Sequence, residues 1–326
     1  MSTAEFIKAQ TQILERFGVE ATSRFINVPL LAGKAHVLVS GDGPPVMMVI
    51  GGGMVAAMWA PLMAQLKGFT LYAVDLPGNG LSDPTTYRTA TLRTTGVGFL
   101  EQVQEGLGLE QSPFIAQSMG GLWSTWLALD RPGRVSAISY IGCPALILGT
   151  SAPFLLRFST LSWVTALLER LDPPSLKRVD RVAAMAGEDL RTMPELRRLF
   201  LESSKLPASG SQLLSLHRAA VRIRGAQPAV ALTPSQLQRL TQPVQLIWGE
   251  NDSFGPPSVG RQAADMIPDA EIHVVGGGHG PWFSQHEMVG WLLTRFLDAN
   301  TRDMPVEIIE PGSGSDRPEP RIRHED

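Results

Sequence analysis

The sequence lacks three features that would each have pointed to a particular class of protein. It contains a single cysteine, Cys143, which excludes an intramolecular disulfide and removes one mark of an oxidising compartment. Its 28 Lys and Arg nearly balance 31 Asp and Glu, so a net charge of −3 gives no indication of a nucleic acid partner. No run of about 20 apolar residues occurs, and we therefore expect no membrane span.

The N-terminal segment also lacks the apolar stretch of a signal peptide, because Glu5, Lys8, Glu15 and Arg16 interrupt it. Its apolar residues follow a helical spacing instead, which predicts an amphipathic helix within residues 1–21 that packs on the rest of the domain. A helix lying on a membrane surface is the alternative. We expect a soluble, cytoplasmic protein.

Unbroken apolar runs predict strands that are buried on both faces, as in a parallel sheet covered by helices. Two β-rich runs at 24–30 and 35–40 come first and are predicted to pair antiparallel. The later apolar runs are 46–50, 71–74, 114–116, 135–141, 244–248 and, more weakly, 271–275. Helical stretches alternate with them, at 57–67, 91–107, 119–130 and 285–298. This alternation predicts a three-layer α/β domain formed by residues 22–146 and 241–299.

Residues 147–240 break the alternation and are predicted to form an inserted helical subdomain. They include helical segments at 154–171 and 195–206 but no strong strand candidate. Between residues 150 and 240 there are 13 Lys and Arg against 7 Asp and Glu. The excess indicates either a solvated basic face or a preference for anionic substrates. The tail, 300–326, is rich in Pro, Gly and charge and is predicted to be disordered.

Ser118 lies in the segment AQSMGG, between a short apolar run and a predicted helix. Ala116 and Gly120 flank it two residues away on either side, and a nucleophile on a sharp strand-to-helix turn needs such small neighbours. The helix start also offers free N–H groups that can stabilise an oxyanion. Alone, the pattern is equally typical of a serine that caps a helix.

Two further residues follow later strands. Asp252 comes just after the run 244–248, and His279 lies in the glycine-rich segment GGGHGPW after the last run. A carboxylate can fix the tautomer of a histidine that activates a serine. Glu250 is a rival for the acid, and each residue alone is typical of a surface turn. Their order, serine then acid then histidine, is the catalytic order of one hydrolase fold, and all three are predicted at the carboxyl ends of parallel strands.

Five segments together resemble the α/β-hydrolase superfamily across roughly residues 22–298. They are GDGPPVMMVIGGG, VDLPGNGLSD, AQSMGG, WGENDSFGPP and GGGHGPW. Two positions depart from the usual motifs: Gly51 stands where the oxyanion loop often has His, and Asn79 replaces a frequent His. The resemblance implies a mostly parallel α/β-hydrolase sheet with 147–240 as a helical cap, or lid.

The resemblance also implies a serine esterase with Ser118, Asp252 and His279 as catalytic triad and no cofactor or metal. The backbone N–H groups of Met119 and Gly53 would form the oxyanion hole, with Gly52 and Met54 as alternatives to Gly53. Trp59, Trp163 and Trp282 are predicted to line an apolar acyl pocket. We expect a small-molecule acyl substrate, and no oligomeric state is implied.

Alternatives remain on the same residues. C–C bond hydrolysis, perhydrolysis and lyase chemistry would use the same triad. A ligand sensor with slow turnover would keep the fold. An NAD(P)-dependent oxidoreductase would use Gly51, Gly53 and Ala56 as a phosphate-binding loop, with Asp75 about 20 residues later on the ribose.

Overall fold

The sheet at the centre of the molecule has eight strands. A computed structural model of the chain describes residues 2–158, 160–161 and 171–301, so the tail predicted to be disordered lies outside the described residues from 302 onward. The order across the sheet is β1-β2-β4-β3-β5-β6-β9-β10. The strands are β1 (Thr22–Val28), β2 (Gly33–Ser40), β3 (Pro45–Val49), β4 (Thr70–Val74), β5 (Ser112–Ala116), β6 (Val135–Ile141), β9 (Val244–Gly249) and β10 (Ala270–Val275).

Strand direction follows the hydrophobic pattern. β2 pairs antiparallel with both β1 and β4, whereas every pairing from β4 to β10 is parallel. All residues of β3, β4 and β5 are buried, which explains why their apolar runs show no alternation. The predicted mostly parallel sheet is therefore confirmed.

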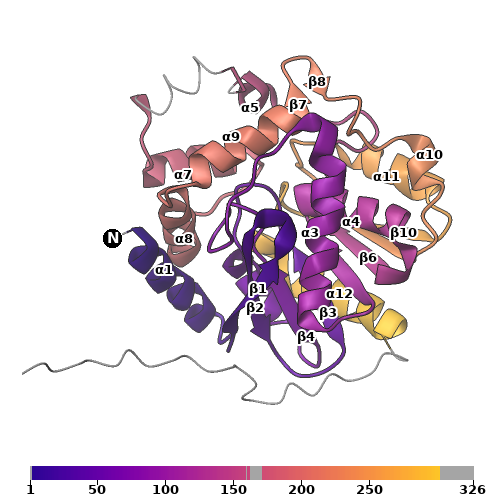
Figure 1. The fold of residues 1–326 in the computed structure, drawn as a ribbon, viewed down its shortest axis with the longest axis horizontal. Coiled ribbons are helices and arrows are strands. Elements are labelled where there is room, and N and C mark those ends of the chain that lie inside the picture. The colour runs from indigo at the N-terminus through magenta and orange to yellow at the C-terminus, as the bar shows by residue number, and fades with distance from the viewer. Residues whose placement is uncertain (1, 159, 162–170, 302–326) are drawn as a thin grey trace, which may run out of the picture.

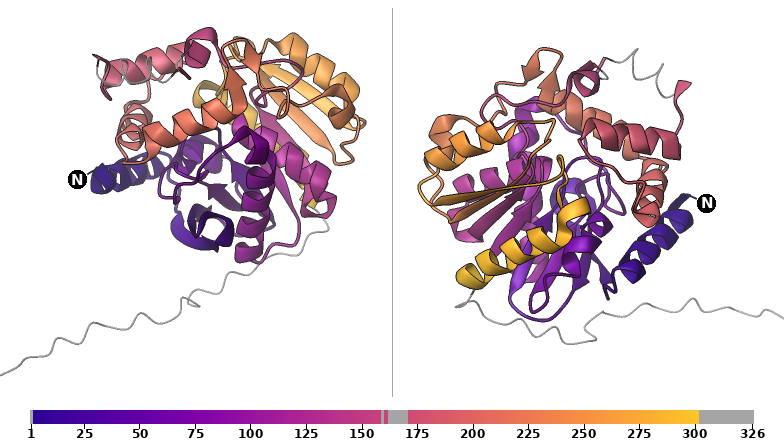
Figure 2. Two further views of the ribbon diagram at one scale, coloured as in Figure 1. Left: turned by 45° about the horizontal axis from the view of Figure 1, so that its top comes forward. Right: turned by 180° about the vertical axis from the view of Figure 1, so that it is seen from behind.

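Helices cover both faces of the sheet (Figures 1 and 2). One face carries α3 (Leu92–Leu107), α4 (Met119–Asp130) and α11 (Pro257–Met266), whose apolar residues share one core cluster. The other face carries α2 (Ala60–Met63) and α12 (Trp282–Thr301), which belong to a second cluster. These are the three layers predicted from the alternation of runs. The short 3-10 turns are η1 (Pro29–Leu31), η2 (Ala56–Trp59), η3 (Thr89–Thr91) and η4 (Pro132–Arg134).

A group of helices between β6 and β9 lies beside the sheet, over the edge where the parallel strands end (Figure 1). Its elements are α5 (Phe154–Phe158), α7 (Leu176–Met185), α8 (Pro194–Ser204), α9 (Ser209–Ala220), a hairpin of β7 (Val221–Arg222) and β8 (Gly225–Ala226), and α10 (Pro234–Leu237). Of the predicted helix 154–171, only α5 is observed, and 159 and 162–170 lie outside the described residues. The sequence patterns did not predict α7, α9 or α11.

The first helix, α1 (Ser2–Arg16), packs against α8 and thus joins the N-terminus to the insertion. Phe6 and Ile13 of α1 are fully buried, and the helix makes ion pairs at both ends. Arg16 lies 2.9 Å from Glu195, and Glu5 lies 3.3 Å from Arg198. The amphipathic pattern was correctly interpreted as packing within the protein. No helix in the described ranges is long and apolar enough to cross a membrane.

Candidate active site

Ser118 occupies the turn between β5 and α4 with a backbone conformation that is rare for a non-glycine residue. Its φ is +50° and its ψ is −114°. Such conformations cost free energy and persist where the surrounding structure enforces them, often at functional sites. The strained turn is what a nucleophile elbow requires, because it holds the serine clear of both the strand and the helix.

The small neighbours of Ser118 have a direct explanation in the packing. A Cβ atom on Gly120 would lie 2.1 Å from the carbonyl oxygen of Val49 in β3. The start of α4 can therefore approach the sheet only if residue 120 is glycine. Ala116, which stands where the usual motif has glycine, is fully buried in β5 and paired with both neighbouring strands. Alanine thus fits the position without loss of the turn.

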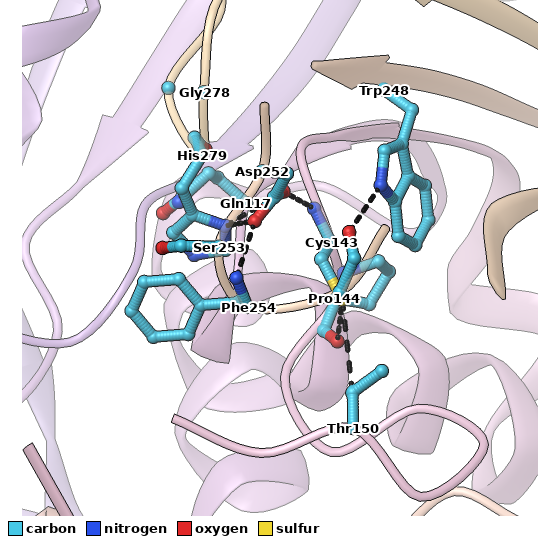
Figure 3. Close-up of polar contacts among 12 residues, drawn as sticks. Gln117, Cys143, Pro144, Thr150, Trp248, Asp252, Ser253, Phe254, Gly278 and His279 are labelled. Atoms are coloured by element: carbon cyan, nitrogen blue, oxygen red, sulfur yellow. Dashed lines mark hydrogen bonds and ion pairs between the residues drawn. The ribbon is translucent and has the colours of Figure 1, made fainter. Parts of the chain in front are cut away.

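Asp252 and His279 lie side by side beyond the ends of β9 and β10 (Figure 3). His279 Nδ1 lies 3.0 Å from each carboxylate oxygen of Asp252, and both residues are buried. The carboxylate also accepts hydrogen bonds from the backbone N–H of Cys143 at 2.7 Å and of Phe254 at 2.9 Å. The Phe254 ring stacks on the imidazole at 3.9 Å. The acid and the histidine are therefore held rigidly together.

The histidine loop is tied to the serine turn. Gln117, the residue before Ser118, donates a hydrogen bond from its side-chain amide to the carbonyl of His279 at 3.1 Å. Ser118 and His279 both line one cavity. His279 Nε2 is buried and has no hydrogen-bond partner among the described residues. Because Nδ1 faces Asp252, Nε2 is the atom left to accept a proton in this cavity. Glu250, the rival acid, is exposed.

The glycine loop after β3 lines the same cavity as the start of α4. Gly52, Gly53, Met54 and Met119 are all among its lining residues. The N–H of Met54 donates to the carbonyl of Gly51 at 3.3 Å, which leaves Gly52 and Gly53 as the candidate donors of this loop. Gly53 has φ +78°, a conformation that favours glycine. Met119 is the first residue of α4, where N–H groups lack intrahelical partners.

Asp75 has a structural role that contradicts the dinucleotide interpretation. Its carboxylate is fully buried and accepts hydrogen bonds from the N–H of Ala56 at 2.6 Å and of Leu81 at 3.1 Å. His36 Nδ1 lies 2.7 Å from it, and His36 Nε2 lies 2.9 Å from Ser23 Oγ. A carboxylate engaged on all sides cannot bind a ribose hydroxyl. Asp75 instead anchors the glycine loop to β4, and Ser23 and His36 extend this network to the edge of the sheet.

The cavity in front of Ser118 has a volume of about 280 Å³ and is mostly apolar. Its apolar walls come from the insertion, the loops and the start of α12, and include Leu146, Leu156, Val179, Val182, Phe200, Leu213, Leu216, Phe254 and Phe283. Polar side chains of the insertion, among them Arg178 and His217, also line it. Burial lowers the pKa of His217 to about 4, so its imidazole is neutral at pH 7.

The tryptophans predicted to line the pocket need correction. Trp59 and Trp282 are fully buried, and their rings pack against each other at a tilt of 31° with centroids 4.5 Å apart. Neither residue lines the cavity. Trp282 also donates from Nε1 to the carbonyl of Met58 at 3.0 Å, which fixes its position. Trp163 lies outside the described residues. Among the described residues, the phenylalanines that line the cavity are Phe200, Phe254 and Phe283, which no sequence pattern singled out.

Cys143 sits at the cavity behind Asp252 and is fully buried. Burial raises the pKa of its thiol well above the ordinary value, and the charge of Asp252 raises it further. A thiol in this environment is a poor nucleophile. Its backbone N–H, rather than its sulfur, contributes to the site by binding Asp252.

Glu188 is a site residue that sequence reasoning missed. It follows α7 in the insertion, lines the cavity and is 8% exposed. Burial raises the pKa of its carboxyl from 4.5 to about 7; hydrogen bonds from Gly280 and Gly278 oppose the rise and the charge of Asp252 adds to it. No motif marks it, because its importance depends on where the insertion folds.

The raised pKa of Glu188 predicts a pH-dependent stability. A carboxyl whose pKa is higher in the folded state stabilises the fold fully below pH 4.5, and this contribution is lost as the pH rises through about 7. Glu188→Gln cannot ionise. Its free energy of unfolding, relative to the parent, should therefore rise by on the order of 3 kcal/mol between pH 4 and pH 8. Urea unfolding at both pH values measures this, and parallel pH curves for the two proteins would contradict it.

Metal-ligand geometry is absent from this region. Within residues 2–158, 160–161 and 171–301, no three His, Cys, Asp or Glu side chains gather as they would around a metal ion. The polar groups of the cavity include a serine on a strained turn, a carboxylate-bound imidazole and free N–H groups at a helix start. This set defines a candidate site for nucleophilic acyl chemistry.

The fold and this site define a class of α/β protein in which the nucleophile follows the central strand. The family model of the α/β-hydrolase fold matches residues 44–284. The chain belongs to the α/β-hydrolase family.

Relatives with two kinds of activity resemble it equally well. A 2-hydroxy-6-oxononadienedioate/2-hydroxy-6-oxononatrienedioate hydrolase of Paraburkholderia phymatum is 26% identical, over 85% of this chain and 96% of the relative. A pimeloyl-acyl-carrier-protein methyl ester esterase of Shewanella oneidensis is also 26% identical, over 81% and 96%. Among solved structures, the carboxylesterase CesB of Bacillus subtilis aligns with a TM-score of 0.73 at 22% identity, over 91% of this chain and 99% of that chain. The chain is thus an α/β hydrolase whose relatives include esterases and C–C bond hydrolases.

Proposed function

We propose that the protein is a serine hydrolase that cleaves carboxylic esters of mostly apolar acids, with Ser118, His279 and Asp252 as its catalytic triad. One observation carries the proposal: Ser118, on a strained turn, shares an apolar cavity with an imidazole whose Nδ1 is fixed by a buried carboxylate. The free Nε2 of His279 is the base that such a serine needs.

The proposed reaction has two halves. His279 Nε2 takes the Ser118 proton as Oγ attacks the ester carbonyl, and the oxyanion is held by the N–H groups of Met119 and Gly53. His279 then gives the proton to the leaving alcohol, so that an acyl-enzyme forms. Water attacks the acyl-enzyme with His279 again as base, and the acid is released. Asp252 keeps the imidazole in the required tautomer and stabilises its charged form throughout.

The helical insertion, residues 147–240, would act as the cap that closes the acyl pocket. Its Leu156, Val182, Phe200 and Leu213 supply apolar wall, which suits a medium-sized acyl group. A Cβ atom on Gly52 would lie 2.8 Å from Leu216, so α9 packs directly on the oxyanion loop. The cap therefore shapes both the pocket and the loop that would bind the oxyanion.

Hydrolysis of a C–C bond is the second candidate, and two observations favour it. One is the similarity to the dienedioate hydrolase of Paraburkholderia phymatum. The other is Arg178, a cation in the cavity wall that could face a substrate carboxylate. Its guanidinium already donates to the carbonyl of Asp172 at 2.7 Å, which positions it on α7.

Intact-protein mass after treatment with a fluorophosphonate tests the proposed nucleophile. We expect one adduct on the parent, mapped to Ser118, and none on Ser118→Ala. A panel of p-nitrophenyl esters and a 2-hydroxy-6-oxodienoate then separates the two reactions. Faster turnover of medium-chain esters supports the esterase, whereas faster cleavage of the dienoate replaces it with the C–C hydrolase. A folded parent without adduct would refute the triad and favour a ligand sensor.

A further inference from the structure

The helical insertion holds the peptide around His279 by accepting hydrogen bonds from three consecutive backbone N–H groups. Glu188 Oε1 accepts from the N–H of Gly278 and from the N–H of Gly280, both at 2.8 Å. Between them, the N–H of His279 donates to the carbonyl of Ala186, also at 2.8 Å. The segment 186–188 therefore binds every N–H from 278 to 280.

The same segment packs tightly on the acid loop. A Cβ atom on Gly187, whose φ is +80°, would lie 2.5 Å from the carbonyl of Asn251 and 3.0 Å from the Cα of Gly278. Ser253 donates from Oγ to the carbonyl of Met185 at 2.6 Å. The two loops that carry Asp252 and His279 are thus bridged by one short piece of the insertion.

Burial of a carboxylate between two loops costs free energy, because the charged group loses its contacts with water. Asp252 is the other anion close to Glu188, and their mutual repulsion adds to the desolvation of both. The other titratable groups that line the cavity are His279, His217, Arg178 and Cys143. On the same segment as Glu188, Asp189 is paired with Arg191 at the surface. An apolar side chain would fill the same space without this cost, so the presence of a carboxylate at the histidine loop points to function.

We propose that Glu188 is a positioning residue for His279. By binding the N–H groups on both sides of His279, it sets the path of the loop and hence the direction of the imidazole between Asp252 and Ser118. This role rests on the function proposed above, because it assigns His279 as the base. It also makes the insertion a contributor to catalysis and not only a wall of the pocket.

Three substitutions of Glu188 distinguish the effect of side-chain length from the effect of charge. Glu188→Gln keeps the length of the side chain and an oxygen that can accept both N–H groups, but it removes the charge. Glu188→Asp keeps the charge and is one methylene shorter, so it cannot reach both groups. Glu188→Ala removes the acceptor altogether. Asp189→Ala is the matched control, since it removes a carboxylate from the next position, where the side chain is exposed.

The readout is the rate of fluorophosphonate labelling at Ser118 over a range of reagent concentrations. We expect Glu188→Asp and Glu188→Ala to lower the saturating rate by roughly 10- to 100-fold, because a misplaced catalytic group costs about that much. The half-saturating concentration should change little. Glu188→Gln should restore most of the rate, and Asp189→Ala should match the parent. A merely structural role would not lower the saturating rate while leaving the half-saturating concentration unchanged. Nor would Glu188→Gln restore the rate in that case.

Hydrogen exchange of the peptide that spans residues 276–281 gives a second readout. It should speed up in the Asp and Ala variants and stay slow in the Gln variant. If Glu188→Ala fails to fold, the comparison between Glu188→Asp and Glu188→Gln tests the role of Glu188 instead. Suppose that the parent is labelled at Ser118 but Glu188→Asp and Glu188→Ala are labelled as fast as Asp189→Ala. This result would overturn the role of Glu188 and leave the proposed function standing. A parent that is not labelled at Ser118 would overturn the proposed function, and this role with it.

Discussion

Replacement of Ser118 by alanine is expected to lower kcat on any ester that the parent hydrolyses by on the order of 10⁶-fold, the loss typical of removing a triad serine. Residual turnover would come from the oxyanion hole and from binding alone. The fold should tolerate the change, because the side chain of Ser118 makes no capping bond to α4. Steady-state kinetics at saturating ester measures the loss.

Ser23→Ala is a stringent control for this result. Ser23 Oγ lies 2.9 Å from His36 Nε2, and His36 Nδ1 lies 2.7 Å from the buried carboxylate of Asp75, whereas His279 Nε2 has no hydrogen-bond partner among the described residues. This second Ser–His–Asp row lies at the edge strand β1 and outside the cavity wall. Removal of Ser23 should leave kcat unchanged. Equal losses of kcat in Ser118→Ala and Ser23→Ala would mean that activity does not depend specifically on the serine at the elbow. The assignment of Ser118 would then be wrong.

Replacement of Asp252 by asparagine is expected to cost about 10⁴-fold in kcat. The asparagine amide would favour the wrong tautomer of His279 and could not stabilise the imidazolium. The structure adds a second penalty. Both carboxylate oxygens accept backbone N–H groups, from Cys143 and Phe254, and an amide can accept at only one of these positions. A buried N–H without acceptor costs about 1–3 kcal/mol, so the variant should also unfold at lower urea concentration.

Glu250→Gln separates the local charge from the specific contact. Glu250 is two residues away and exposed, and the ion pair of His279 is made with Asp252 instead. We expect kcat and the urea midpoint of this variant to equal those of the parent. An activity loss at residue 250 as large as that at residue 252 would show that the acid of the triad has been misassigned.

Much of the core could be predicted because its signals are local. Strands buried on both faces require unbroken apolar runs, and 46–50, 114–116 and 244–248 indeed became β3, β5 and β9. The order of Ser118, Asp252 and His279 at strand ends predicted that they would lie at one edge of the sheet. The structure places Ser118 and His279 in the wall of one cavity and Asp252 against His279 Nδ1. Backbone geometry at the elbow follows from small neighbours that can be read from the sequence.

The walls of the cavity were not predictable, because they depend on packing between segments distant in sequence. Trp59 and Trp282 were assigned to the pocket for their size, but a large aromatic ring gains as much from burial in the core, where both lie. Glu188 looks like any helix-terminal carboxylate until α7 is placed against the histidine loop. Some basic side chains of the insertion form surface ion pairs, as in Arg197–Asp180 and Arg181–Asp172, and local composition does not reveal these pairs.

The contact between α1 and α8 has a consequence for how the chain is synthesised. Arg16 and its partner Glu195 are 179 residues apart in sequence, so at typical synthesis rates α1 leaves the ribosome roughly 10 to 40 s before α8 does. During that interval the apolar side of α1 that faces α8 has no partner from the insertion. The growing chain therefore lacks the α8 partner for this apolar face of α1 through much of its synthesis. Chaperone binding during synthesis, or early packing of α1 on the strands already made, would limit aggregation of the incomplete chain.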